Sequence, residues 1–166
     1  MLDAIWEALT GLPPEIVTLI IGTLPVSEVR GAIPVGIALG GLSWQTAFLF
    51  GAIGNALPVI PLLLGLEPVS NWLRRWRIWD RFFEWLFART RRRGKMIERY
   101  EALGLLLFVS IPLPVTGAWT GCAAAFVFGI RPRLAIPVVF GGILIASTVV
   151  TLATLGVIGG VELFTR

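Results

Sequence analysis

Two charged residues, Glu28 and Arg30, stand two positions apart between long uncharged stretches. Residues 16–27 before them and residues 31–66 after them, 12 and 36 positions, carry no charge. A charge inside a bilayer costs about 2.5–3.5 kcal/mol or more, so a retained pair has a structural or a functional reason. In the functional interpretation, Arg30 holds an anion through its planar guanidinium, while Glu28 balances that charge or carries a proton. In the structural interpretation, the pair only neutralises itself.

Further polar and small residues near the predicted breaks in the apolar segments extend this candidate site. Asn55 lies within a predicted span, where it either bonds to another helix or lines a cavity. The predicted substrate-binding residues are Glu28, Arg30, Gly31, Asn55, Thr116, Gly117, Trp119 and Thr120. We expect no catalytic residue, cofactor or metal. The chain has no histidine and one cysteine, which argues against a metal cluster of such ligands. Hydrolysis usually needs a nucleophile with a base or two carboxylates, whereas the membrane interior holds one carboxylate beside an arginine.

The composition is that of an integral membrane protein. Of the 166 residues, 56% are hydrophobic and 14% are charged, whereas a soluble domain carries about 25% charged residues. Residues 74–99 hold ten of the 14 basic residues and three acidic ones, a net charge of +7 against −3 for the rest. By the positive-inside rule this basic segment is cytoplasmic. We expect a multi-pass protein of the plasma membrane, with the bilayer as partner and no nucleic acid. The acidic N-terminal residues Asp3, Glu7 and Glu15 indicate no cleavable signal peptide.

Two predominantly apolar stretches, 43–65 and 133–161, are long enough to cross a bilayer, because a span needs about 20 apolar residues. Two more, 14–42 and 102–130, are interrupted at 25–31 and 111–117, because prolines there break a helix. The arms left on either side of each break reach about half of a bilayer. We therefore expect two re-entrant hairpins whose broken tips lie at the membrane midplane.

The alternative is that each interrupted stretch is one proline-kinked transmembrane helix. The charges favour the hairpins, because a re-entrant second hairpin keeps Arg131 and Arg133 on the same side as the basic segment. The two halves also resemble each other, since PVS at 25–27 and PVT at 114–116 are each followed by a glycine 15 positions after the proline. An inverted repeat with discontinuous helices is typical of a transporter with a midplane site.

The segment between the two halves has an amphipathic pattern. Trp72, Trp76 and Trp79 recur at helical spacing, with arginines on the other face. Such a helix lies in the membrane interface and either only anchors the protein or also gathers lipid.

We therefore expect an all-α integral membrane fold, an inverted repeat of re-entrant helical hairpin plus transmembrane helix, in one domain over 1–166. The expected order is an N-terminal interfacial segment (1–13), a re-entrant hairpin (14–42), a transmembrane helix (43–65), a cytoplasmic amphipathic basic region (66–101), a second re-entrant hairpin (102–130) and a second transmembrane helix (133–161).

Three ordered motifs carry a resemblance to a known family: SEVRGAIPVG at 27–36, GNALP at 54–58 and PLPVTGAWTG at 112–121. With them the sequence resembles the putative small multidrug export protein family, which is itself similar to a branch of the DedA/VTT superfamily. That resemblance implies two facing re-entrant hairpins and the movement of a lipid, either a polyprenyl-phosphate carrier or a phospholipid. Unlike DedA proteins, which have arginines in the second hairpin, this chain has Thr116, Trp119 and Thr120 there.

We expect a translocator of an anionic lipid, similar to a flippase or scramblase, with its site between the two hairpin tips. One alternative is a proton-coupled exporter of small amphiphilic cations, with Glu28 as the proton acceptor. Another is a membrane-shaping or scaffold protein in which the amphipathic helix acts. The sequence leaves open whether protons are partners and whether the chain forms a homodimer.

Cysteine labelling in a Cys122→Ala background tests this topology. Single cysteines at positions 90–95 and 131–133 should react with a membrane-impermeant thiol reagent from the same, cytoplasmic side, because a re-entrant hairpin returns the chain to the side from which it started. Labelling of 131–133 from outside would show that 102–130 crosses the membrane once, and the inverted repeat would be lost.

Overall fold

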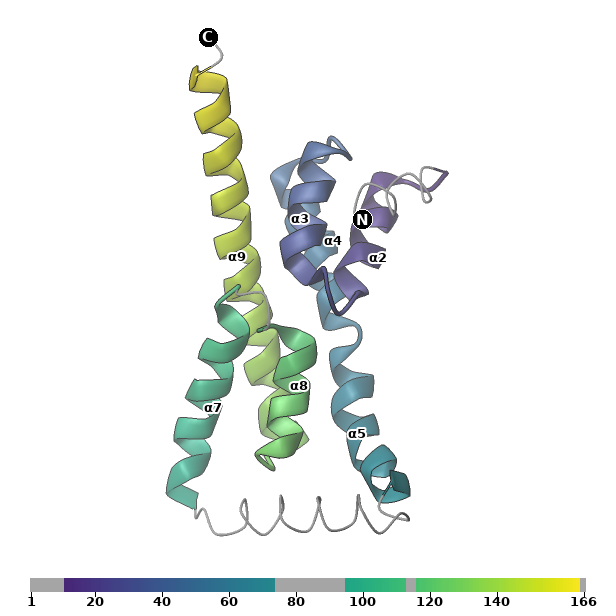
Figure 1. Cartoon of the computed structure of the whole chain (residues 1–166), viewed down its shortest axis with the longest axis vertical. Helices are drawn as coiled ribbons and strands as arrows, with labels where there is room; N and C mark the ends of the chain where they lie inside the picture. The colour runs from purple at the N-terminus through teal and green to yellow at the C-terminus, as the bar shows by residue number, and fades with distance from the viewer. Residues whose placement is uncertain (1–10, 74–94, 113–115, 165–166) are drawn as a thin grey trace. The chain divides into compact units, whose positions relative to one another are not determined.

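The computed structural model describes residues 11–73, 95–112 and 116–164, and within these ranges the chain forms helices joined by turns, with no strand (Figure 1). The helices are α2 (Pro14–Thr23), α3 (Glu28–Ala38), α4 (Trp44–Ala56), α5 (Val59–Leu73), α7 (Lys95–Ser110), α8 (Ala118–Val127) and α9 (Pro132–Phe164). Most of the predicted interfacial segment 1–13 and of the amphipathic helix 72–86 lies outside the described residues. The all-helical class is confirmed.

The chain divides into two compact units. The first comprises Met1–Leu57 and Ile143–Arg166, and the second comprises Pro58–Gly142. The long helix α9 contributes its N-terminal part to the second unit and the remainder to the first. Each unit is described by itself.

In the first unit, α2 and α3 form a helical hairpin (Figure 1). Pro14 occupies the start of α2, where proline is favoured because its missing N–H would have no helical partner. Leu24 has an extended backbone (φ −75°, ψ 135°), the conformation preferred before a proline, and Pro25 follows it. Helix α2 has 10 residues and α3 has 11. They are therefore about 15 and 17 Å long, roughly half of the hydrocarbon thickness of a bilayer.

Helix α4 packs against both arms of this hairpin through glycines. A Cβ atom added to Gly22 of α2 would lie 2.8 Å from the carbonyl oxygen of Gly51 on α4, and one added to Gly54 would overlap the carbonyl group of Leu19. On the other arm, a Cβ at Gly36 would lie 2.7 Å from the hydroxyl oxygen of Thr18 and 3.3 Å from the Cβ of Ala47. The backbones of α2 and α4 are therefore in direct contact, as in other membrane helix pairs with small residues at the interface.

The second unit contains another helical hairpin, formed by α7 and α8. A Cβ on Gly121 of α8, or on Gly142 at the end of this unit's part of α9, would collide with the side chain of Val109 on α7. Helix α5 packs on α8, where the thiol of Cys122 contacts the carbonyl oxygen of Val59 at 3.9 Å. Close approach at a glycine is thus present in both hairpins, at Gly36 and at Gly121.

Two helical stretches of the described chain, Trp44–Leu66 and Pro132–Ile158, are long and apolar enough to cross a membrane. They coincide with the predicted spans, although a turn at Leu57 and Pro58 divides the first of them into α4 and α5. Large apolar side chains are exposed along them, for example Leu152 at 65%, which suits contact with lipid. The shorter apolar helices suit half-membrane arms, and their re-entry into the membrane stays a prediction.

Replacing Gly54 by alanine should destabilise the first unit by about 1–3 kcal/mol, because the new methyl group meets the backbone of Leu19, which cannot rotate away. Thermal unfolding in detergent micelles measures the effect. Gly65→Ala is the matched control, since a Cβ there meets nothing within 4 Å and alanine is favoured over glycine in a helix. Equal unfolding temperatures for Gly54→Ala and the parent would contradict the backbone contact.

Candidate functional site

The polar residues of the first unit gather at the tip of its hairpin. Glu28 is the first residue of α3 and Arg30 lies in the same turn. We expected backbone interrupted from Pro25 to Gly31. Instead, the amide of Glu28 already donates to the carbonyl oxygen of Leu24 at 3.0 Å, and α3 begins there. Arg30 therefore lies on a helix, and Glu28 is the first residue of that helix.

Glu28 and Arg30 form an ion pair whose two members differ in accessibility. The Nη2 atom of Arg30 lies 3.3 Å from Oε2 of Glu28. The side chain of Glu28 is 3% exposed and that of Arg30 is 20% exposed. A solute that approaches this tip therefore meets the guanidinium first, with the carboxylate behind it.

The backbone of Glu28 is strained. Its φ of 49° lies in the left-handed region, and Glu28 is the one residue other than glycine with a positive φ in the described part of the chain. Such a conformation costs about 1–3 kcal/mol and persists where its surroundings hold it, often at functional sites. The strain supports a role for this turn beyond packing.

Among the described residues of this unit, two buried polar atoms have no hydrogen-bond partner: Oγ of Ser27 and Oδ1 of Asn55. These residues are 5% and 2% exposed. Other buried hydroxyl groups bond back to their own helix, as Thr18 does to the carbonyl oxygen of Pro14 at 2.8 Å; Ser110, Ser147 and Thr151 do the same. Since a buried polar group without a partner costs about 1–3 kcal/mol, Ser27 and Asn55 are exceptions that need an explanation.

The register between α3 and α4 brings Asn55 to the level of this turn. Gly36 lies against Ala47, and one turn along α4 Gly51 lies against Ile33, so the two helices run antiparallel. One further turn of each helix sets Asn55 opposite the start of α3. We call Ser27, Glu28, Arg30 and Asn55 the tip site; Gly31, also buried, lies next to Arg30.

The other predicted site residues belong to the second unit, at the start of α8. The hydroxyl of Thr116 donates to the carbonyl oxygen of Ile111, and that of Thr120 to the carbonyl oxygen of Gly117 at 3.4 Å. The Thr116 hydroxyl thus helps to close the break between α7 and α8, whereas the Thr120 hydroxyl bonds to the N-cap residue of its own helix. Gly117 is buried and Trp119 is half-buried. The structure brings Glu28, Arg30 and Asn55 together within one unit, whereas this second group lies in the other.

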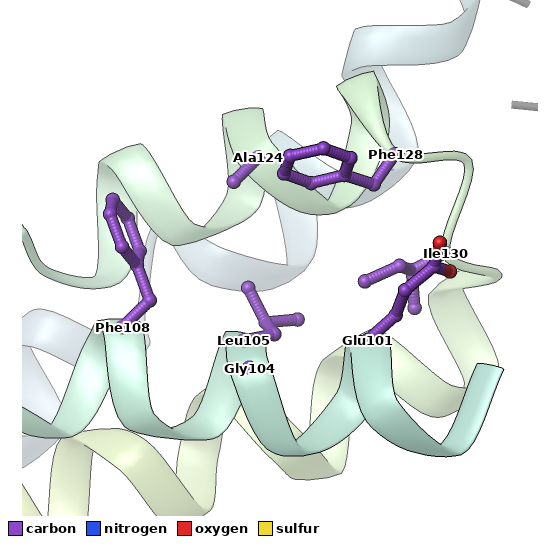
Figure 2. A pocket seen from close by; sticks show the side chains of 7 residues that line it. All are labelled: Glu101, Gly104, Leu105, Phe108, Ala124, Phe128 and Ile130. Atoms are coloured by element: carbon purple, nitrogen blue, oxygen red, sulfur yellow. The ribbon is translucent and has the colours of Figure 1, made fainter. Parts of the chain in front are cut away.

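Two residues of interest escaped the sequence prediction. Ser27 directly precedes Glu28 in a motif we had singled out, but its lack of a partner depends on the tertiary structure. Glu101 borders the uncharged stretch 102–130 and was read as a boundary, yet it lines a cavity of about 430 Å³ between α7 and α8 (Figure 2). An acidic residue at the edge of an apolar stretch was the available signal.

Together, the apolar helices and the buried ion pair define a helical membrane protein with a charged site in its interior. A model of the putative small multi-drug export protein family matches residues 28–149, and the chain belongs to this family. Comparisons with curated proteins and with solved structures found no match. The family and the two spans support a membrane transport or export protein. The match contains every residue that the sequence predicted for the site.

Asn55→Leu should keep or raise the unfolding temperature, because it removes a buried oxygen whose missing hydrogen bond costs about 1–3 kcal/mol. It should also lower the movement of labelled anionic lipid across reconstituted liposomes, if the oxygen serves the substrate. Thr18→Val is the matched control, since that hydroxyl is bonded within its own helix. Transport at the parental rate by a folded Asn55→Leu variant would remove Asn55 from the tip site.

Proposed function

We propose that this protein translocates an anionic lipid, a polyprenyl phosphate or a phospholipid, and that the phosphate binds at Arg30 of the tip site. The observation that carries the proposal is the unequal burial of the ion pair, 20% exposed at Arg30 against 3% at Glu28. The buried carboxylate reduces the cost of keeping a cation among apolar helices. The guanidinium remains the group that a phosphate can reach.

The side chains, rather than the helix dipoles, set the sign of charge at this tip. The C-terminal end of α2 and the N-terminal start of α3 meet there, and their partial charges of about −0.5 and +0.5 oppose each other. Arginine suits a phosphate because its planar fork can donate two parallel hydrogen bonds. The more accessible member of the pair therefore favours an anion.

Ser27 and Asn55 supply the remaining contacts of a lipid headgroup. The Ser27 hydroxyl can donate to a phosphate oxygen, and the Asn55 carbonyl oxygen can accept from a headgroup hydroxyl or ammonium. Both atoms lack a partner within the described chain. The substrate would thus satisfy two groups that the fold leaves unpaired.

Arms of this length support a site near the midplane. Helices of 10 and 11 residues reach about halfway through the hydrocarbon layer when they enter from one surface. A lipid headgroup bound there has crossed half of the apolar barrier, and no covalent step is required. In this proposal the protein lies in the plasma membrane with its basic segment 74–99 in the cytoplasm, where it would attract anionic headgroups.

The family description names multi-drug export, and this supports a second candidate. We propose as this alternative a proton-coupled exporter of small amphiphilic cations. In that function Glu28 would accept a proton or a cationic substrate, and Arg30 would hold the carboxylate in place. The charge of the transported molecule separates the two candidates.

Arg30→Lys should reduce the movement of labelled phospholipid or polyprenyl phosphate in liposomes by about tenfold or more, because the forked hydrogen bonds to phosphate are lost. Arg30→Gln should abolish it. Arg133→Gln is the matched control, because Arg133 is exposed at the start of α9. Efflux of a labelled lipophilic cation is measured in the same liposomes, and a cation-only activity would replace the first candidate with the second.

Glu28→Gln separates charge balance from proton carriage. If Glu28 only balances Arg30, the variant should transport more slowly with an unchanged pH dependence, whereas loss of the parental pH dependence would identify a proton carrier. The double variant Glu28→Gln with Arg30→Gln tests the structural alternative, because a purely structural pair can be replaced by neutral groups with little loss. Parental transport by that variant would leave the tip site without a function.

A further inference from the structure

A cavity between α7 and α8 of the second unit combines apolar walls with a single charged group. It has a volume of about 430 Å³ and is lined by Glu101, Gly104, Leu105, Phe108, Ala124, Phe128 and Ile130. Small-molecule sites commonly measure about 300–1,000 Å³. Leu105 and Ile130 are buried, at 4% and 8% exposure, whereas Phe108 and Phe128 are 37% and 47% exposed. The cavity therefore has a buried floor and an accessible aromatic rim.

The polar group of this cavity is the carboxylate of Glu101. Its Oε1 atom is buried and has no hydrogen-bond partner within the described residues. Figure 2 shows the carboxylate beside Ile130 at one end of the cavity and the ring of Phe108 at the other, with Leu105 and Phe128 between the two ends. Glu101 and Phe108 are seven residues apart on α7, which corresponds to about 10 Å along the helix.

We propose that this cavity binds a lipophilic organic cation, with the positive charge at Glu101 and the apolar groups against the two phenylalanine rings. Aromatic faces attract cations as well as apolar groups, and Glu101 is the charged residue among those that line the cavity. A phosphate or carboxylate ligand would be repelled by it. An acyl chain would fill the space but leave the buried oxygen unpaired, which is costly.

This inference is independent of lipid translocation at the tip site, because it concerns other residues and is measured as binding rather than as transport. It adds a cation site on the second unit to the proposed anion site on the first. For an exporter of cationic amphiphiles, it would be a cation site in addition to Glu28.

Equilibrium dialysis of the purified full chain in detergent micelles tests the proposal with tetraphenylphosphonium. Tetraphenylborate, an anion of nearly the same size and shape as tetraphenylphosphonium, is the comparison probe. The parent should bind the phosphonium, and Glu101→Gln should weaken that binding by about tenfold or more, as expected when one partner of a desolvated charge pair is removed. Tetraphenylborate should not lose affinity in this variant. Glu15→Gln makes the same substitution on α2 and should change neither value.

Equal phosphonium affinities, within a factor of about two, for the parent and a folded Glu101→Gln variant would overturn the proposal. Equal binding of the two probes by the parent would also overturn it and would favour an acyl chain as the occupant. Gel-filtration and thermal unfolding profiles establish whether each variant is folded. If Glu101→Gln does not fold, Ala124→Phe is the second test, because it fills the cavity and keeps the carboxylate. Loss of phosphonium binding in this variant supports the site, and unchanged binding refutes it.

Discussion

The backbone contact between α2 and α4 is the constraint on which the first unit depends. Gly54 lies against the carbonyl group of Leu19, and Gly22 lies against that of Gly51, at distances that a side chain would prevent. Lipid offers no hydrophobic driving force between apolar helices, so this close approach supplies the packing that holds them together. The same contact brings Asn55, the residue after Gly54, into the helix interface at the level of the hairpin tip.

Satisfaction of polar groups is the second constraint, because an apolar surrounding provides no water to replace a missing hydrogen bond. Buried hydroxyls on α2, α7 and α9 meet it by bonding to the preceding turn of their own helix. Ser27 and Asn55 do not meet it, and neither does one carboxylate oxygen of Glu101. Two of these three groups adjoin a strained, charged turn and the third lines a cavity, so the exceptions coincide with the places where a ligand would supply the partner.

The two proposed sites have opposite chemistry. In the first, the carboxylate of the Glu28–Arg30 pair is buried and the guanidinium is more accessible, which favours an anion. In the site proposed on the second unit, one carboxylate oxygen lacks a partner within the described chain and adjoins the apolar and aromatic residues of a cavity, a setting that suits a cation. Both proposed sites are on helical hairpins, where small residues let neighbouring helices approach closely.

The sequence by itself determined the membrane class, the two spans and the two interrupted segments. These properties follow from composition and from proline, whose missing N–H and fixed ring act locally and need no partner elsewhere in the chain. The hairpin arms of the structure accordingly lie within or beside the predicted segments, although α7 begins seven residues before the expected arm at 102.

Only the tertiary structure decided which polar groups are accessible, paired or left alone. Sequence spacing indicated that Glu28 and Arg30 are close, but not that α3 begins at Glu28, that this residue has a positive φ, or that the carboxylate is the more buried partner. The sequence also did not indicate the unpaired oxygen of Asn55 or the cavity at Glu101. Burial and hydrogen-bond partners depend on which helices lie against each other, and residues distant in the sequence set those contacts.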